Sequence, residues 1–311
     1  MALQLFRKQA RENHVYNRYL AYLGVDPFQI SQVMDIPFLP ISFFKSHEVV
    51  TGSWTPEVTF TSSGTAGQAV SRHSIASLSH YLLHAQTIFE MTFGSLRNYH
   101  ILALLPSYLE RTGSSLVAMA NHFIGESQSP YSGFYLNDLD GLAKQLEALR
   151  NSESRAGRKV LLLGVSFALW DLAEQHTLDL GHCMVMETGG MKGRRKEIIR
   201  EELHEILCRN LNIQKVFSEF GMTEMLSQAY SMGEGMFRCP ASVRVLVREI
   251  NDPFGVTTRA SGVINVVDLA NTHSCAFIET QDLGRIGQDG HFEVLGRLDN
   301  SDIRGCNLML G

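Results

Sequence analysis

The sequence lacks several features that would assign it to a special class of protein. No uninterrupted apolar run reaches the roughly 18 residues of a membrane-spanning helix, and no basic-then-apolar signal segment opens the chain. Positive charge is not in excess, because 27 Lys and Arg stand against 32 Asp and Glu, for a net charge of -5. This balance gives no general attraction to nucleic acid or anionic membranes. We therefore expect neither a membrane span nor a nucleic-acid partner.

Paired cysteines are also missing. The five cysteines are Cys183, Cys208, Cys239, Cys275 and Cys306. Their number is odd and no two are spaced as Cys-x-x-Cys, so the sequence gives no sign of a disulfide framework. We expect a reducing, cytoplasmic setting.

The 311 residues, 44% of them hydrophobic, are enough to bury a sizeable core. Short apolar runs at residues 99–106, 159–164 and 183–187 are each followed by a segment with helical spacing. Runs of this kind are typical of strands buried on both faces of a parallel sheet. The pattern predicts an α/β fold.

Beyond residue 230 the pattern changes. Segments 242–248, 262–269 and 292–295 are short, alternating or apolar, and are separated by turn residues, as in β structure. We therefore divide the chain into an α/β core over residues 1–240 and a β-rich portion of the same large domain over residues 241–311.

A loop rich in hydroxyl groups and glycines, TFTSSGTAGQAVSRH, covers residues 59–73. Its hydroxyls and glycine N–H groups could cradle a phosphate. A strand should precede it and a helix over residues 74–93 should follow, so the helix N-terminus would add partial positive charge. The Walker pattern is missing, because no Gly-Lys-Ser/Thr follows the glycines. A plain surface turn is the alternative, and the loop alone leaves both interpretations open.

A second cluster, SEFGMTE over residues 218–224, follows a predicted strand at residues 215–217. Phe220 and Gly221 could present a flat face to a base, while Thr223 and Glu224 could face phosphate and Mg²⁺. The alternative is a helix-capping turn, because Thr and Glu also favour helix starts.

Two further signals lie near the end of the chain, TQDLG and GRLDNSDIRG. Asp282, which we place at a turn, could hold the vicinal hydroxyls of a ribose, and Arg297 could hold the same sugar or an α-phosphate. Asp-Leu-Gly is also an ordinary turn sequence.

The order TSSGTAG, FGMTE, TQDLG and GRLDNSDIRG resembles the adenylate-forming superfamily, which includes acyl-CoA and aryl-CoA ligases. Within it the chain is most similar to the LuxE family of acyl-protein synthetases, in LLPSYLERTGSSLVAM, TGGMKGRR and IRGCNLM. The resemblance covers nearly the whole chain. It implies the layered α/β large domain of adenylate-forming enzymes, with the small C-terminal domain and its adenylation lysine absent or truncated.

The resemblance also implies that ATP and Mg²⁺ activate a carboxylic acid as an acyl-adenylate, whose acyl group then passes to a thiol. The residues matching the phosphate loop are Thr61, Ser62, Ser63, Gly64, Thr65 and Gly67. Those matching the adenine site are Gly189, Gly190, Phe220 and Gly221. Glu224 matches the Mg²⁺ carboxylate, Thr223 the hydroxyl facing the phosphates, Asp282 the ribose aspartate and Arg297 the arginine that follows it.

Cys306 lies where the resemblance implies the acyl-accepting thiol, and Arg304 could lower the pKa of that thiol. Cys183 and Cys208 fall in predicted elements and should be buried and inert. A departure from the family pattern is that Ala66 and Gln68 replace a threonine and a lysine found in many relatives.

We favour a fatty acid as substrate and leave two alternatives open. One is an acyl-CoA synthetase of the phenylacetate-CoA ligase type, and the other is a degenerate protein that binds nucleotide or an acyl carrier. The implied partners are an acyl reductase or an acyl-carrier protein, and a homo-oligomer also stays open.

Overall fold

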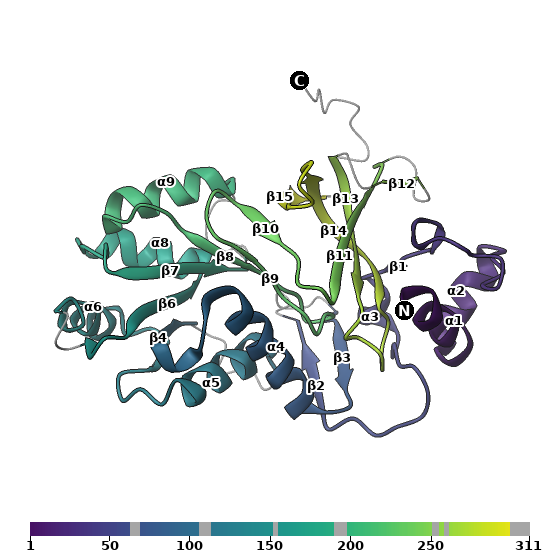
Figure 1. The fold of residues 1–311 in the computed structure, drawn as a ribbon, viewed down its shortest axis with the longest axis horizontal. Helices are drawn as coiled ribbons and strands as arrows, with labels where there is room; N and C mark the ends of the chain where they lie inside the picture. Colours follow the sequence, from purple (N-terminus) through teal and green to yellow (C-terminus); the bar gives the residue numbers. More distant parts are fainter. Residues whose placement is uncertain are drawn as a thin grey trace.

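The computed structural model in Figure 1 describes residues 1–62, 69–105, 113–151, 155–189, 198–250, 255–257 and 261–298. Their helices are α1 (Ala2–Glu12), α2 (His14–Tyr22), η1 (Val33–Asp35), α3 (Phe43–Ser46), α4 (Leu78–Phe93), η2 (Leu96–Asn98), α5 (Ser115–Ser127), α6 (Leu139–Ala148), α8 (Ser166–Gln175) and α9 (Arg200–Leu211). Within these ranges, no helix is long and apolar enough to span a bilayer.

The strands form one large mixed sheet and one hairpin. They are β1 (Leu39–Pro40), β2 (Val58–Thr61), β3 (Arg72–Ile75), β4 (Tyr99–Leu104), β5 (Gly133–Tyr135), β6 (Lys159–Val165), β7 (Cys183–Thr188), β8 (Phe217–Phe220), β9 (Ala229–Ser231), β10 (Met236–Arg238), β11 (Val243–Arg248), β12 (Val256–Thr257), β13 (Ser261–Asp268), β14 (Phe277–Ile286) and β15 (Phe292–Arg297). The large sheet has thirteen strands, in the order β12-β11-β13-β14-β15-β10-β9-β8-β7-β6-β4-β5, with β1 paired to β14.

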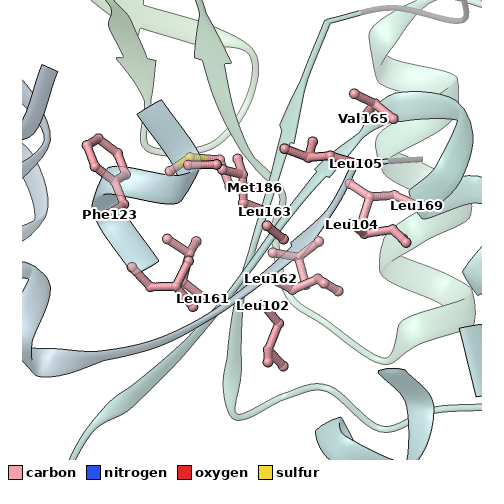
Figure 2. Packing of buried hydrophobic residues seen from close by; sticks show 14 of the residues in the cluster. Leu102, Leu104, Leu105, Phe123, Leu161, Leu162, Leu163, Val165, Leu169 and Met186 are labelled. Carbon is pink, nitrogen blue, oxygen red and sulfur yellow. The ribbon is translucent and has the colours of Figure 1, made fainter. Parts of the chain in front are cut away.

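One half of this sheet is parallel and buried on both faces. Strands β5, β4, β6, β7 and β8 run parallel, with α4 and α5 on one side of them and α8 and α9 on the other (Figure 1). All six residues of β4 are buried. Figure 2 shows Leu102, Leu162 and Met186 packed among the other core residues of this half. Burial on both faces explains why these strands have continuous apolar sequences, and the predicted strands at β4, β6 and β7 are confirmed.

The other half is antiparallel and carries a second core. Strands β11, β13, β14 and β15 pair with their neighbours in antiparallel register, and helices α1 and α2 cover them. Phe6 of α1 meets Phe277 of β14 edge to face, with ring centroids 5.8 Å apart. This core joins residues from the first 50 positions to residues from Phe220 onward, so segments distant in the sequence build it together. The division between residues 240 and 241 stays an interpretation of the sequence.

The loop at residues 59–73 joins two strands, so the predicted order of strand, loop and helix is wrong. β2 and β3 form an antiparallel hairpin in which Thr61 pairs with Arg72. Helix α4 begins only at Leu78, where the Ser77 hydroxyl accepts the His80 N–H at 3.2 Å. The polar sequence RHSI of β3 gives no strand signal of its own, which is why the helix was predicted too early. Strand β3, and not the N-terminus of α4, is therefore the first described element after residues 63–68.

Candidate functional site

A cavity of about 110 Å³ opens where β7 and β8 end. Four of the predicted site residues line it, namely Thr61, Gly189, Gly221 and Thr223. They come from three different segments of the chain. In α/β sheets ligands bind beyond the carboxyl ends of parallel strands, and the structure brings the predicted residues together at such an edge.

Thr61 reaches this cavity because the hairpin is fixed to the start of α5. The Thr61 N–H donates to the Gly113 carbonyl oxygen at 2.7 Å. Gly113 has a φ of +93°, and a Cβ placed there would lie 2.9 Å from the Thr59 carbonyl oxygen. Glycine is therefore required at position 113 for this close approach. On the other side of the loop, the Ser62 hydroxyl accepts the Ser71 N–H at 2.9 Å.

A buried carboxylate to which the sequence analysis assigned no role forms part of the cavity wall. Glu219, the third residue of β8, is 6% exposed and accepts a hydrogen bond from the Thr188 hydroxyl of β7. A Cβ on Gly221 would collide with this carboxylate. The only signal in the sequence is an acidic residue placed directly before FGMTE.

The turn that carries Thr223 and Glu224 is held by two buried polar side chains. His73 Nδ1 lies 2.8 Å from the Thr223 carbonyl oxygen and therefore carries the donated proton. Asn271 Nδ2 donates to the Glu224 carbonyl oxygen at 2.8 Å, and its Oδ1 lies 3.2 Å from His73 Nε2. Burial lowers the pKa of His73, which opposes the effect of these hydrogen bonds. The backbone of the turn is thus fixed from β3 and from the segment after β13.

Asp268, at the end of β13, fixes the backbone that directly follows this turn. Its carboxylate accepts the N–H groups of Leu226 at 2.8 Å and Ser227 at 3.0 Å, and the Ser227 hydroxyl at 2.7 Å. Such a fully buried carboxylate is stable only when its oxygens are paired. Asp268, Asn271 and His73 were missed in the sequence, because isolated polar residues form no local pattern.

The side chain of Glu224 is 5% exposed. Burial raises its pKa, while a hydrogen bond with Ser71 and the charges of Lys45 and Arg297 lower it. Among the residues that the structure describes, no group of three or more His, Cys, Asp or Glu side chains gathers where it could hold a metal ion. A Mg²⁺ ion at Glu224 would therefore need oxygen ligands from elsewhere, as the phosphates of a nucleotide provide.

Asp282 and Arg297 lie opposite each other on β14 and β15. The prediction of a turn at Asp282 is wrong, because TQDLG runs through the middle of β14. The register shifts after Leu283, which accommodates the turn-like sequence inside a strand. Arg297 Nε is 3.7 Å from Asp282 Oδ1, and the two side chains are 74% and 20% exposed. Burial raises the pKa of Asp282, and the charge of Arg297 opposes that rise.

The remaining site predictions are placed as follows. Phe220 is 7% exposed and packs edge to face on Phe292, with ring centroids 5.2 Å apart, so its contact with adenine stays a prediction. Ser63, Gly64, Thr65, Gly67, Gly190 and Cys306 lie outside the described residues. Cys183 and Cys208 are half-buried. Burial raises the pKa of both thiols, that of Cys183 to about 12.

Solved structures with a similar fold are adenylate-forming enzymes. They include ATP-bound MatB from Rhodopseudomonas palustris, with a TM-score of 0.55 and 18% identity over 77% of this chain and 47% of that chain. The O-succinylbenzoate coenzyme A synthetase MenE from Bacillus subtilis, in complex with AMP, has a TM-score of 0.55 and 18% identity over 80% of this chain and 50% of that chain. An open conformation of 2-hydroxyisobutyryl-CoA ligase in complex with 2-HIB-AMP and CoA has a TM-score of 0.63 and 14% identity over 96% of this chain and 68% of that chain.

These likenesses define the fold as the large domain of adenylate-forming enzymes, and the chain spans about half the length of the MatB structures. The family model described as "Acyl-protein synthetase, LuxE" matches residues 1–311, so the chain belongs to the LuxE family. A search of curated proteins found no match.

Proposed function

We propose that this protein activates a carboxylic acid with ATP and passes the acyl group to a thiol. The observation that carries the proposal is the cavity at the ends of β7 and β8, which Thr61 and Thr223 both line and whose lining residue Thr223 directly precedes the buried Glu224. Membership of the LuxE family supports it, as do the ATP in the MatB structure and the AMP in the MenE structure.

The first step forms an acyl-adenylate. An oxygen of the substrate carboxylate attacks the α-phosphorus of ATP, the bond from that phosphorus to the β-phosphate oxygen breaks, and pyrophosphate leaves. In such a displacement the protein mainly positions the reactants and neutralises charge. The proposed phosphate contacts are Thr61, Ser62, Ser63, Gly64, Thr65, Gly67 and Thr223. Glu224 is the proposed ligand of a Mg²⁺ ion, which the phosphate oxygens would also bind.

The nucleoside would be held by residues that line or border the cavity and by a pair of residues on β14 and β15. We assign the ribose to Asp282 and Arg297, whose paired placement on β14 and β15 supports the assignment. We assign the adenine to the segments that follow β7 and β8, and the proposed contacts are Gly189, Gly190, Phe220 and Gly221.

In the second step a thiolate sulfur attacks the acyl carbonyl carbon and AMP leaves. We propose Cys306 as that thiol. Burial raises the pKa of the four described cysteine thiols, that of Cys239 to about 11 and that of Cys275 to about 12, which makes them poor nucleophiles at neutral pH. An acyl reductase or an acyl-carrier protein is the partner that would then take the acyl group.

Carboxylate-dependent exchange of labelled pyrophosphate into ATP tests the first step. A fatty acid such as tetradecanoic acid is the substrate that the family resemblance suggests, and it should be tried beside short acids. Exchange with any acid supports the proposed function. Complete absence of exchange across the panel, in protein that binds ATP, would favour a degenerate nucleotide-binding protein instead.

Labelled acid tests the second step. Protein incubated with ATP, Mg²⁺ and a labelled acid that supports exchange should carry label that neutral hydroxylamine releases. This label should be lost in Cys306→Ser and kept in the control Cys208→Ser. Label that persists undiminished in Cys306→Ser would remove this cysteine from the proposal, and free acyl-CoA formed only when CoA is added would support the CoA ligase alternative.

A further inference from the structure

Lys45 is an exposed lysine on the short helix α3, and the segment before this helix is tied to β14. Strand β1 pairs with Ile278 and Glu279 of β14 in parallel register. The Ile41 N–H, which follows β1, donates to the Glu279 carbonyl oxygen at 2.8 Å. Asp282, the proposed ribose carboxylate, lies further along the same strand. The start of α3 is therefore fixed to a strand that carries part of the proposed nucleotide site.

The same helix also packs on the hairpin of β2 and β3. Helix α3 lies beside β3 (Figure 1). Phe44 is fully buried, and its ring meets the His73 ring edge to face, with centroids 5.7 Å apart. His73 Nδ1 in turn lies 2.8 Å from the Thr223 carbonyl oxygen. Because Lys45 directly follows Phe44, its backbone is held close to the turn that carries Glu224.

The ammonium group of Lys45 is available to a ligand. Within the described part of the chain, no hydrogen bond or ion pair engages this group. Its charge nevertheless lowers the pKa of Glu224, as the charge of Arg297 does. Of these two cations, Arg297 already faces Asp282 at 3.7 Å. An anion bound at Glu224 would therefore meet an uncommitted positive charge at Lys45, since charges attract more strongly at short distance.

The proposed first step needs such a charge. Negative charge accumulates on the pyrophosphate as its bond to the α-phosphorus breaks, and a cation already in place stabilises that charge. The ionised Glu224 would itself repel the phosphates. A lysine ammonium group is a compact charge with three hydrogen-bond donors, which suits it to phosphate oxygens.

We propose that Lys45 binds the β- and γ-phosphates of ATP and neutralises the pyrophosphate as it leaves. The assignment to these phosphates follows from the side of approach, because α3 packs on the strand that follows the proposed phosphate loop, whereas Arg297 lies beside the proposed ribose contact. Lys45 forms no covalent bond and transfers no proton in this step. This inference rests on the proposed function and adds a catalytic residue to it.

Binding of two nucleotides tests the contact. Lys45→Met keeps an unbranched side chain but removes the charge. In isothermal titration calorimetry it should weaken binding of ATP with Mg²⁺ by about tenfold or more. Its affinity for AMP should be unchanged, because AMP lacks the β- and γ-phosphates. Lys45→Arg keeps the charge and should restore most of the ATP affinity. Lys144→Met, which changes an exposed lysine of α6, is the control and should bind both nucleotides like the parent.

Two further measurements separate a charge contact from a structural role. Salt screens exposed charges, so the difference in ATP affinity between Lys45→Met and the parent should shrink as the NaCl concentration rises. The thermal unfolding temperature of the variant should match that of the parent, because the side chain is exposed. Pyrophosphate exchange at saturating ATP should still be slowed by about tenfold or more, because the charge grows in the transition state.

The outcomes separate this inference from the proposed function. Parental ATP affinity in Lys45→Met, or an equal loss for ATP and AMP, would overturn the contact. A parental exchange rate at saturating ATP would overturn the catalytic role. Neither result would affect acid activation by the parent. Absence of exchange in a parent protein that binds ATP would contradict the proposed function, while a loss confined to ATP in Lys45→Met would still support the phosphate contact. A parent protein that binds no ATP would overturn both.

Discussion

The pair formed by Asp282 and Arg297 shows how the fold could position a ribose-binding carboxylate before the nucleotide binds. Burial raises the pKa of Asp282, because it disfavours the ionised carboxylate, and the charge of Arg297 opposes this effect. A carboxylate in this setting gains more from hydrogen-bond donors than an exposed one does. Arg297 remains 74% exposed, so its guanidinium is still accessible to a ligand.

We predict that Asp282→Ala weakens ATP binding by roughly ten- to a hundredfold, because loss of a hydrogen bond to a charged group costs about 1.5 to 3 kcal/mol. Isothermal titration calorimetry of ATP with Mg²⁺ provides the measurement. Asp289→Ala removes an exposed turn aspartate and should leave the dissociation constant unchanged. Parental affinity in Asp282→Ala would show that this residue does not contact the nucleotide.

At the scale of elements, the hairpin of β2 and β3 depends on the close approach of Gly113. Among the described residues, the hairpin forms a separate two-stranded sheet and pairs with no strand of the large sheet. Its position beside the cavity is set in part by the bond from Thr61 to Gly113. Any side chain at position 113 would press against the backbone of β2 next to the proposed phosphate loop.

Gly113→Ala should therefore weaken ATP binding and also destabilise the fold. The positive φ and the collision with the Thr59 carbonyl oxygen together should lower the free energy of unfolding by roughly 2 to 4 kcal/mol. Gly52→Ala is a matched control, because Gly52 has a φ of +80° and a Cβ there meets nothing within 4 Å. Urea unfolding of both variants separates the effect of the collision from that of the positive φ. Equal losses of unfolding free energy in the two variants would contradict this explanation.

The elements that could be predicted from the sequence are those in which nearly every residue lies in the same buried environment. Strands β4, β6 and β7 are buried on both faces, so their apolar runs could be recognised without neighbours. Strand β3 and the middle of β14 could not, because RHSI and TQDLG are polar and gain strand structure only from pairing partners. Within the site, Thr61 and Thr223 belong to dense motifs that could be read locally. Lys45 is a single basic residue, and its place beside the turn depends on distant segments.

At the scale of the whole molecule, Arg200 connects the two halves of the large sheet. Its Nε donates to Glu187 of β7 at 2.9 Å, and its Nη1 donates to the Val294 carbonyl oxygen of β15 at 3.0 Å. The guanidinium also lies 5.0 Å from the centre of the Phe237 ring of β10. Burial alone would raise the pKa of Glu187, but His204 and Arg200 lower it to about 2.

This lowered pKa predicts a specific dependence of stability on pH. The ionised Glu187 stabilises the fold above its ordinary pKa of 4.5, and this contribution is lost as the pH falls toward 2. Glu187→Gln should therefore be less stable than the parent at pH 7, and the difference should shrink between about pH 4.5 and pH 2. Urea unfolding at several pH values measures it. A difference that stays constant over this interval would contradict the assignment.

The hydrogen bonds around Glu224 also determine when the site can form during synthesis. The bond from His73 to Thr223 joins residues 150 positions apart, and the contact from His73 to Asn271 joins residues 198 apart. Gln9 Nε2 donates to the Asn271 carbonyl oxygen across 262 positions. Contacts between such distant residues form late, because closing long loops costs entropy. A nascent chain whose Asn271 is still inside the ribosome would already carry FGMTE but not its fixed turn, so nucleotide binding should appear only after Asn271 has emerged.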